Sequence, residues 1–339
     1  MKIKRFFDAI LLGINVVVAA VLLFSCVVPY ISIKIFPFLS ALSLGVPLLV
    51  IANTIFFVFW LLRIKKQALI SLSVLVLSYI VLGSFFQFRF SEKTPEADDF
   101  SVMTLNTRVL NKYLWIKDAT IGQQIVDFVA TKNPDVVCFQ EFDKVYRNAF
   151  KSYPYSYIDL VPNAKRTVQA IYSKYPIIGK DVVPFPNTFN SAIYVDIATP
   201  KDTLRIYNVH MESLKISPST IAFSQEESGK LYTRMSNSFV KQQEQAEIMA
   251  EHRLSSPYKT VICGDFNNTQ FSSVYKTIKG DMVDSFEAAG IGYGRTYDFP
   301  YFPMRIDFIL SDKEMPVKTH HNFSVKLSDH FPVQAYLEP

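Results

Sequence analysis

Three long apolar stretches fill most of the first 90 residues, at positions 6–30, 36–62 and 68–86. Each has about the 18–25 residues that a helix needs to cross a hydrocarbon core about 30 Å thick. Asp8, near a helix start, is the one charged residue within the three stretches, and Lys34 lies in the first connection. A soluble helix of such length would carry a polar face, which these stretches lack. The sequence therefore predicts an all-α transmembrane region of three helices.

The first stretch also has features of a processed leader. Basic residues precede an apolar run within residues 1–26, as in a signal peptide, but no small-x-small cleavage site follows. Residues 23–26 resemble a lipoprotein cleavage box, yet Phe24 is bulky where a small residue belongs, and the chain stays apolar past Cys26. We therefore expect this stretch to remain in the protein as a span.

Positive charge is unevenly placed around the three stretches. Basic residues precede the first and separate the second from the third, with a single one in the remaining loop: Lys2, Lys4, Arg5, Arg63, Lys65, Lys66 and, alone, Lys34. Basic residues concentrate on the cytoplasmic side of membrane proteins. We therefore expect a multi-pass protein of the cell (inner) membrane, with a cytoplasmic N-terminus and residues 90–339 outside the cytoplasm, as in the periplasm.

The net charge of +5 divides unequally along the chain. Residues 1–90 carry eight basic residues and one acidic residue, a net charge of +7. The remaining 27 basic and 29 acidic residues give residues 91–339 a net charge of −2. A domain of this charge has no bulk field to attract a polyanion, which disfavours tight non-specific binding to DNA.

The three cysteines, Cys26, Cys138 and Cys263, form neither a disulfide framework nor a C-x-x-C metal pair. Each lies in an apolar run, where a free cysteine behaves as a small hydrophobic side chain. We expect all three to be buried and structural.

Residues 87–99 are polar and predict a linker, and from residue 100 short β-rich runs alternate with helical patterns. The runs lie at 100–105, 136–139, 168–172, 192–197, 204–209, 260–263, 306–310 and 332–336, and the helical patterns at 120–132 and 236–254. Many strands with few helices favour packed sheets covered by helices over a barrel. The second domain, residues 100–339, is therefore expected to be α/β.

Polar clusters follow several of these strands. They are Leu105-Asn106, Gln140-Glu141, Asn208-Val209-His210, Gly264-Asp265-Phe266-Asn267, Arg305-Ile306-Asp307 and Ser328-Asp329-His330. Strand ends are where sheet proteins assemble sites, because the scaffold fixes the backbone while the side chains converge. One such cluster alone is commonly a turn or a helix cap. Their joint occurrence predicts a functional site.

In type and order these clusters resemble the endonuclease/exonuclease/phosphatase superfamily, which includes deoxyribonucleases, abasic-site endonucleases, sphingomyelinases and inositol-polyphosphate 5-phosphatases. The resemblance spans about residues 100–338, and its most specific parts are Gly264-Asp265-Phe266-Asn267 and Ser328-Asp329-His330. It implies a four-layered α/β sandwich, in which two mixed β-sheets pack face to face with helices outside. It also implies a hydrolase acting on phosphoric ester bonds.

The resemblance further implies a divalent-metal site. Glu141 matches the family's metal ligand, Asp329 an auxiliary ligand, and Asn106 a residue close to both metal and phosphate. Hard oxygen ligands suit Mg²⁺, which typically takes one or two carboxylates, and Mn²⁺ is the alternative. A cation on the phosphate reduces the repulsion that protects phosphodiesters from nucleophiles.

Four further positions match catalytic residues of the family. Asp265 matches the residue that orients or deprotonates the attacking water, and Asn267 a donor to the phosphate. His330 matches the histidine on the scissile phosphate. Asp307 matches its partner carboxylate, which would keep the ring protonated and oriented.

His210 matches a second histidine of the family, which contributes to transition-state charge or to protonation of the leaving group. Its acidic partner stays unassigned, since Glu212 could equally be a rim residue. Every expected position carries a competent side chain, which disfavours an inactive scaffold.

Two connections, residues 211–240 and 290–304, are expected to select the substrate. They carry basic and aromatic side chains, namely Lys215, Lys230, Arg234, Arg295, Tyr297 and Tyr301. Arg295 and Tyr297 are expected to bind substrate, beside Asn106 and Asn267. An aromatic ring there could stack on a base, meet a lipid interface or pack the loop.

Three functions follow from this pattern. A short linker to a membrane favours a phosphodiesterase acting on lipid head groups or on another small extracytoplasmic phosphoester. An extracytoplasmic nuclease acting on DNA or RNA is the first alternative, and an interaction module with an inactive site is the second. The expected side of the membrane disfavours an inositol-phosphate phosphatase. The sequence predicts no particular oligomeric state.

Overall fold

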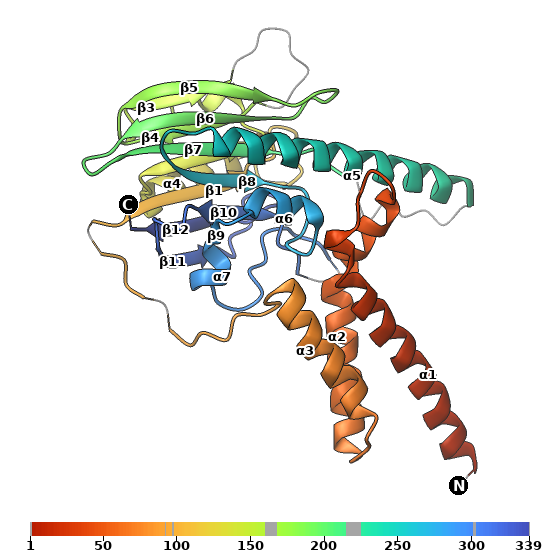
Figure 1. The fold of residues 1–339 in the computed structure, drawn as a ribbon. Helices are drawn as coiled ribbons and strands as arrows, with labels where there is room; N and C mark the ends of the chain where they lie inside the picture. The colour runs from red at the N-terminus through yellow and green to blue at the C-terminus, as the bar shows by residue number, and fades with distance from the viewer. Residues whose placement is uncertain are drawn as a thin grey trace.

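The computed structural model describes residues 2–91, 93–96, 98–159, 168–214, 225–300 and 303–338. It contains an N-terminal helical region, residues 2–82, and an α/β sandwich, residues 100–338 (Figure 1). The three N-terminal helices project from one end of the sandwich, and the N-terminus lies at their far end (Figure 1).

The helical region contains α1 (Lys2–Ser25), α2 (Ala41–Leu62) and α3 (Ala68–Leu82), with 3₁₀ turns η1 (Val28–Tyr30) and η2 (Pro37–Ser40) between the first two. Two segments, Ile3–Tyr30 and Pro37–Leu62, are long and apolar enough to cross a membrane. α3 has 15 residues, which is about 22 Å of helix and shorter than a hydrocarbon core. The region is compatible with membrane anchoring, but only two of the three expected spans reach spanning length.

The third predicted span is too long at its C-terminal end. α3 ends because the next residue, Gly83, takes a φ of 84°, which breaks the helix. Phe85 then packs on Phe271 with ring centroids 5.4 Å apart, and Phe86 packs on Tyr293 at 4.8 Å. The prediction of a span reaching residue 86 is therefore wrong, because these rings attach the chain to the sandwich.

Polar side chains join the three helices inside the helical region. Asn15 of α1 donates to Ser71 Oγ of α3 at 2.7 Å and accepts from Trp60 Nε1 of α2 at 3.1 Å. Toward the N-terminal end, Arg63 and Asp8 form an ion pair of 2.6 Å that the sequence did not predict. Hydrogen bonds between buried side chains fix how helices pack, so the three helices form one unit.

The described residues of the sandwich form two six-stranded mixed sheets, ordered β11-β12-β1-β2-β4-β3 and β5-β6-β7-β8-β10-β9. The pairs β1–β2 and β7–β8 are parallel and the others are antiparallel. The strands are β1 (Phe100–Asn106), β2 (Val136–Gln140), β3 (Tyr155–Ile158), β4 (Ala170–Ser173), β5 (Ile177–Pro184), β6 (Ser191–Ala198), β7 (Thr203–His210), β8 (Lys259–Asp265), β9 (Val283–Asp284), β10 (Asp307–Ser311), β11 (Val317–Asn322) and β12 (Val333–Leu337).

The eight predicted strands correspond to the inner strands of the two sheets, and the four that the sequence missed are the four edge strands, β3, β5, β9 and β11. β3 and β5 are largely exposed or half-buried, and β9 has two residues. An edge strand buries less of each face than an inner strand, so it needs no continuous apolar run.

Helices cover the outer face of each sheet. Side chains such as Val102 and Ile206 fill the space between the sheets, where the free cysteines Cys138 and Cys263 are buried as expected. α4 (Ile121–Lys132) packs on the outside of the first sheet, and α5 (Gln225–Leu254) and α6 (Ser273–Lys279) on the outside of the second. α7 (Ser285–Ala289) follows β9, and the short turns are η3 (Val109–Asn111) and η4 (Lys144–Tyr146). The sandwich thus has the predicted four layers.

The connection predicted at residues 211–240 is partly wrong. α5 begins at Gln225, so Lys230 and Arg234 belong to a helix of 30 residues. The first part of α5 is polar and lacks the periodic apolar stripe from which an amphipathic helix is predicted. Two residues of the predicted substrate-selecting connections, Lys215 and Tyr301, lie outside the described residues.

The start of the predicted linker lies against the sandwich. The Gln87 backbone N–H donates to the Gly292 carbonyl at 2.8 Å. The Arg89 guanidinium donates to the carbonyls of Glu287 and Gly290, each at 3.1 Å. The chain is therefore attached to the sandwich from its first residues after α3.

The helical region meets the sandwich at the loop that follows β8. Thr269 Oγ1 donates to the Ser43 carbonyl in the first turn of α2 at 3.1 Å. Phe271 is buried in a cluster with Leu22 of α1 and Val46 of α2. The loop after β8 and the first turn of α2 are thus held together.

Candidate active site

Three polar residues of the second sheet lie side by side because of strand register. Asp265 is the last residue of β8, His210 the last of β7 and Asp307 the first of β10. Asp265 is paired with His210 on one side and with Asp307 on the other. Residues directly opposite in a sheet project from the same face, so the fold brings these three predicted catalytic residues together.

Gly264 makes this register achievable. Its φ is 136°, and a Cβ added there would lie 2.0 Å from the Val209 carbonyl oxygen of β7. No other residue type fits without moving a strand. Gly264 therefore allows β8 to approach β7 closely and to present Asp265 at the strand end.

The first sheet supplies the facing residues. Asn106 ends β1 and is paired with Gln140, the last residue of β2. Glu141 follows directly and has a φ of 49°, an uncommon conformation for a residue with a side chain. Thr107 Oγ1 donates to the Glu141 carbonyl at 2.7 Å and holds this turn. Glu141 thereby leaves the strand direction at the same edge as Asn106.

A buried amide pair joins the two sheets behind the site. Gln140 Nε2 donates to Asn208 Oδ1 at 2.6 Å, and Asn208 Nδ2 donates to the Phe139 carbonyl at 2.8 Å. Both side chains are fully buried. Buried amides with good hydrogen bonds fix geometry, so these two predicted cluster residues position the strand ends.

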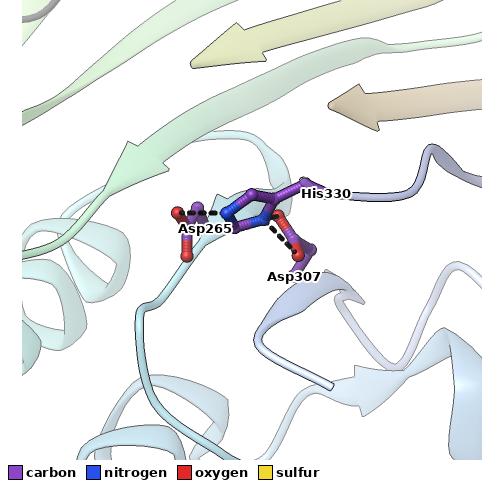
Figure 2. Close-up of side chains that lie close together, drawn as sticks. All are labelled: Asp265, Asp307 and His330. Atoms are coloured by element: carbon purple, nitrogen blue, oxygen red, sulfur yellow. Dashed lines mark hydrogen bonds and ion pairs between the residues drawn. The ribbon is translucent and has the colours of Figure 1, made fainter. Parts of the chain in front are cut away.

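His330 lies between two buried carboxylates (Figure 2). Its Nδ1 is 2.9 Å from Asp307 Oδ2, a hydrogen-bond distance, and its Nε2 is 3.8 Å from Asp265 Oδ2. Burial opposes a charge on His330, but the carboxylates of Asp307 and Asp265 outweigh burial and raise the pKa of the ring to about 10. The ring is therefore a cation at neutral pH, as expected for this pair.

Asp265 is almost fully buried, and burial raises its pKa to about 6 despite the opposing charge of His330. The Asn267 backbone N–H donates to Asp265 Oδ1 at 2.8 Å, and Asn106 Nδ2 donates to Oδ2 at 3.0 Å. Asn267 Nδ2 divides its hydrogens between the Met211 carbonyl at 3.0 Å and Asp265 Oδ2 at 3.3 Å. These donors fix the orientation of the carboxylate.

Asn106 presents its amide nitrogen to the site. Its Oδ1 accepts the Arg108 backbone N–H at 3.1 Å, so its Nδ2 must face Asp265 and Glu141. A metal ion would need the oxygen instead. The geometry therefore suits Asn106 as a donor to phosphate better than as the predicted metal neighbour.

His210 Nε2 lies 3.8 Å from Glu141 Oε1 and 3.9 Å from Asp265 Oδ2. Burial lowers the pKa of His210, against the opposing charge of Asp265. Glu212, which the sequence leaves unassigned, accepts a hydrogen bond from Thr188 Oγ1. The carboxylates at the Nε2 side of His210 thus come from strand ends far away in sequence.

Two sets of side chains could hold a metal ion. Within the described residues, Asp265, Asp307 and His330 form a group whose ligand atoms lie within 4.8 Å of one another. A protonated His330 offers no free nitrogen, so this group suits a charge relay better than a metal site. Glu141 and Asp329 supply carboxylates at the same cleft, and burial raises the pKa of Glu141. A divalent cation would offset that cost, so these two residues fit a Mg²⁺ site.

The site residues line a cleft of about 210 Å³, which we call the cleft: Leu44, Asn106, Glu141, His210, Ser213, Leu214, Asp265, Asn267, Tyr297, Phe299, Met304, Ile306, Asp329 and His330. The lining combines polar side chains with apolar ones such as Leu44 and Leu214. Tyr297 lies with its ring centroid 4.9 Å from that of His330. Arg295, also predicted to bind substrate, is paired with Asp298 and lies over the Phe331 ring, outside the cleft lining.

Two of the described residues at the site lie outside every cluster and connection predicted from the sequence. Arg108 Nη1 lies 3.2 Å from Asp329 Oδ2, and its guanidinium lies over the Trp115 ring at 4.4 Å. Its position two residues after Asn106 was the signal available in the sequence. Leu44 of α2 lines the cleft. The sequence contains no signal for Leu44, because the contact joins parts of the chain far apart.

The comparisons with known proteins identify the family and the fold. The model of the Endonuclease/Exonuclease/phosphatase family matches residues 103–330. A second model, a domain of unknown function (DUF8431), matches residues 8–85, the helical region with three residues beyond it. The comparison with curated proteins finds no match.

Several solved structures share the fold at low sequence identity. A D. rerio TDP2 with 14 humanising mutations is 14% identical with a TM-score of 0.54, covering 72% of this chain and 100% of that one. The mannosyl-6-phosphatase of Bacteroides thetaiotaomicron VPI-5482 is 19% identical with a TM-score of 0.53, covering 70% and 99%. An endonuclease/exonuclease/phosphatase from Beutenbergia cavernae DSM 12333 is 19% identical with a TM-score of 0.53, covering 71% of each chain. At these identities the likeness is one of fold.

Proposed function

Because this chain belongs to the endonuclease/exonuclease/phosphatase family, whose members hydrolyse phosphoester bonds, we propose that it is a divalent-metal-dependent phosphoesterase held at a membrane by its N-terminal helices. The observation that carries the proposal is the His330 ring, 2.9 Å from Asp307 and 3.8 Å from Asp265. One cleft thereby contains a cation for the phosphate and a carboxylate for the attacking water.

Asp265 acts on the attacking water in this proposal. It accepts a proton as the water oxygen bonds to phosphorus, and the leaving oxygen departs on the opposite side. A base works best when its pKa lies near the operating pH, and the pKa of about 6 for Asp265 meets that condition. In the free enzyme the side-chain N–H groups of Asn106 and Asn267 hold the carboxylate, and we assign these groups to the phosphate once the substrate is bound.

The histidines act on the charge that develops during the reaction. The Nε2 side of His330 faces Asp265, and its positive charge stabilises the phosphate oxygens. Asp307 orients the ring through Nδ1 and keeps it protonated. His210, whose pKa burial lowers, stabilises the transition state or the leaving oxygen by hydrogen bonding.

Glu141 and Asp329 are the proposed metal ligands, with Mg²⁺ as the expected ion and Mn²⁺ as the alternative. Both carboxylates line the cleft beside the catalytic residues. A bound divalent cation would neutralise phosphate charge and so reduce the barrier to nucleophilic attack. Asn106 is assigned to the phosphate, since its oxygen is bonded to the Arg108 N–H.

The proposed substrate is a lipid head group or another small phosphoester outside the cytoplasm. Basic side chains gather at the end of the helices that carries the N-terminus: Lys4, Arg5, Arg63 and Lys65 form one pocket there with Asp8. By the positive-inside rule this end faces the cytoplasm, and the sandwich lies on the other side. A reporter fused after residue 95 tests this: we expect a periplasm-active reporter to work, and activity in the cytoplasm alone would contradict the orientation.

An extracytoplasmic nuclease is the second candidate. The exposed rings of Tyr113 and Trp115 lie near Arg108 and could stack on bases. One solved relative is a D. rerio TDP2 complexed with a single-strand DNA product. The apolar lining residues Leu44 and Leu214, and the net charge of −2 for residues 91–339, favour the smaller substrate. An inactive interaction module is less favoured because the set of competent side chains is complete.

The full chain in vesicles, with Mg²⁺, separates these functions when it is tested on plasmid DNA, sphingomyelin and bis(p-nitrophenyl) phosphate. We expect hydrolysis of the aryl diester or the lipid. Cleavage of DNA alone would favour the nuclease. Silence on all three substrates, with Mn²⁺ as well, would contradict the proposal and favour the interaction module.

A further inference from the structure

An apolar groove of about 660 Å³ lies between α2, α3 and the sandwich. Its walls include Ile51 and Ile55 of α2, Val76 of α3, and Phe271 and Tyr293 of the sandwich. This volume lies within the range of about 300–1,000 Å³ that is usual for ligand sites. We call it the groove, and it is separate from the catalytic cleft.

The groove begins within one helical turn of the cleft. On α2, Leu44 lines the cleft and Pro47 lines the groove. Three residues of helix correspond to a rise of about 4.5 Å. From Pro47 the lining continues along α2 to Ile55, a further rise of about 12 Å. The groove therefore extends from the edge of the cleft along the helices toward their far end.

On the sandwich side, too, the cleft and the groove are lined by neighbouring residues. Met304 and Ile306 line the cleft, whereas Pro303 and Arg305 line the groove. Successive side chains of an extended segment point to opposite sides. One short segment thus separates the two spaces, and a molecule bound in both would pass around its edge beside α2.

The surroundings of the groove indicate what occupies it. Ile55, Val76 and Tyr79 line it and are still 63%, 50% and 55% exposed. They belong to a helical region with two segments long and apolar enough to cross a membrane. Hydrocarbon would cover these exposed apolar faces and also fill the groove. A water-soluble ligand would leave the exposed faces uncovered.

The charge of the groove supports the same occupant. Among its described lining residues Arg305 is the sole charged side chain. Its Nη1 lies 2.6 Å from Asp284 Oδ2, and its guanidinium lies over the rings of Phe286 and Phe308. Asp284 neutralises this charge, whereas Nε and Nη2 of Arg305 are buried without a hydrogen-bond partner among the described residues. The rest of the described lining is uncharged, so the groove suits a hydrocarbon chain, and an anionic phosphoester is better placed in the cleft.

We propose that the groove binds the hydrocarbon chain of a lipid substrate while the phosphoester head group enters the cleft at Asp265 and His330. This inference rests on the proposed phosphoesterase function and names its substrate class. Hydrolysis consumes one water and breaks one P–O bond. The water oxygen stays on phosphorus, and the departing oxygen takes a proton to become an alcohol.

The test compares two neighbouring positions of α3. Val76 and Leu77 are 50% and 46% exposed, and Val76 lines the groove whereas Leu77 does not. Val76→Trp would narrow the groove, and Leu77→Trp is the matched control. Both variants and the wild type are assayed as full chains in vesicles with Mg²⁺.

Pairs of substrates with the same head group, one with acyl chains and one without, distinguish an effect on the groove from an effect on the cleft. The p-nitrophenyl esters of phosphate, phosphorylcholine and phosphoglycerol first identify the head group that is removed fastest. The second substrate is the dipalmitoyl lipid with that head group, which is phosphatidic acid, phosphatidylcholine or phosphatidylglycerol. We expect Val76→Trp to lower kcat/KM for the lipid about tenfold, with the aryl ester unchanged. Leu77→Trp should change neither.

The outcomes are distinct. A wild-type enzyme that cleaves an aryl ester but not the matched lipid overturns the inference and leaves the phosphoesterase proposal standing. Equal effects of Val76→Trp on lipid and aryl ester, or equal effects of the two variants on the lipid, also overturn it. Silence on every substrate contradicts the phosphoesterase function itself, and the inference fails with it.

Discussion

The sandwich buries its apolar side chains, whereas the helical region exposes many of its own. In the sandwich, apolar side chains fill three layers and polar side chains converge at one set of strand ends. In the helical region, large apolar side chains such as Phe6, Val17, Ile55 and Ile80 are 62–71% exposed. The sandwich is therefore suited to water and the helices to hydrocarbon. The two regions meet at the loop after β8, and Leu44 of α2 lines the cleft, so the cleft lies at their boundary.

The largest expected effect tests the polar half of this comparison. Asp265→Asn removes the proposed base while keeping its size, so we expect kcat for an aryl phosphodiester to fall on the order of 10³-fold. Asp281→Asn is the matched control, because Asp281 is a half-exposed aspartate that pairs with Arg253 and Lys313. An equal loss in both variants would show that the cleft is not the catalytic site.

The next effect concerns the metal. Glu141→Gln should lower turnover on the order of 10²-fold at fixed Mg²⁺ and raise the Mg²⁺ concentration needed for half-activation. Glu244→Gln on the exposed face of α5 is the control. A Mg²⁺ titration that is identical in both variants would remove Glu141 from the metal site.

Mg²⁺ should also change stability in a pH-dependent way. Burial raises the pKa of Asp265 from 3.8 to about 6, so the folded chain holds this proton more tightly than the unfolded chain. Stability from this group is present below pH 4 and is lost as pH rises through about 6. Mg²⁺ held by Glu141 and Asp329 in the same cleft would favour the charged form of Asp265 and offset that loss, so we expect Mg²⁺ to raise Tm more at pH 7.5 than at pH 5. A larger rise at pH 5 would contradict the assignment of Mg²⁺ to this cleft.

A smaller effect on turnover tests whether Asp307 acts on His330 through its negative charge or only through its shape. Asp307→Asn keeps a partner at Nδ1 but removes the negative charge that raises the pKa of His330 to about 10. The pKa of His330 would then be lower, so the ring would lose its proton at a lower pH than in the wild type. We expect a loss on the order of tenfold at pH 7.5, a smaller loss at pH 6, and an alkaline limb moved to lower pH. A pH-rate profile of unchanged shape would assign Asp307 a purely structural role.

The smallest expected effect lies at the junction of the two regions. Thr269→Val removes the hydrogen bond to the Ser43 carbonyl, which contributes about 1 kcal/mol. Hydrogen exchange in the first turn of α2 should accelerate about fivefold, with turnover of an aryl ester unchanged. Thr131→Val, which loses only a bond within α4, is the control and should leave α2 unaffected.

The two regions also differ in how far the sequence predicts them. Asp265, Asp307 and His330 were predictable because each follows or precedes an apolar strand, and strand ends converge in any sheet of this kind. The four edge strands were not, since half-exposed strands lack a continuous apolar run. The end of α3 was missed because Phe85 and Phe86 continue the apolar pattern, and their packing against Phe271 and Tyr293 is a tertiary contact.

The groove and the role of Leu44 were beyond prediction for the same reason. Both depend on how α2 sits against the loop after β8, which joins residues more than 200 positions apart. The apolar stretches predict a membrane region, but local pattern carries no information about which side chain of a span faces another domain. The helices remain compatible with the expected anchor, and the structure adds that Leu44 of α2 lines the cleft.

One measurement tests the central claim most directly. Bis(p-nitrophenyl) phosphate is given to the full chain in vesicles, with Mg²⁺ or with EDTA, for the wild type and for His330→Gln. A phosphoesterase site at His330 predicts hydrolysis that requires the metal and falls on the order of 10²-fold or more in the variant. Equal hydrolysis by the variant, or hydrolysis unaffected by EDTA, would contradict it.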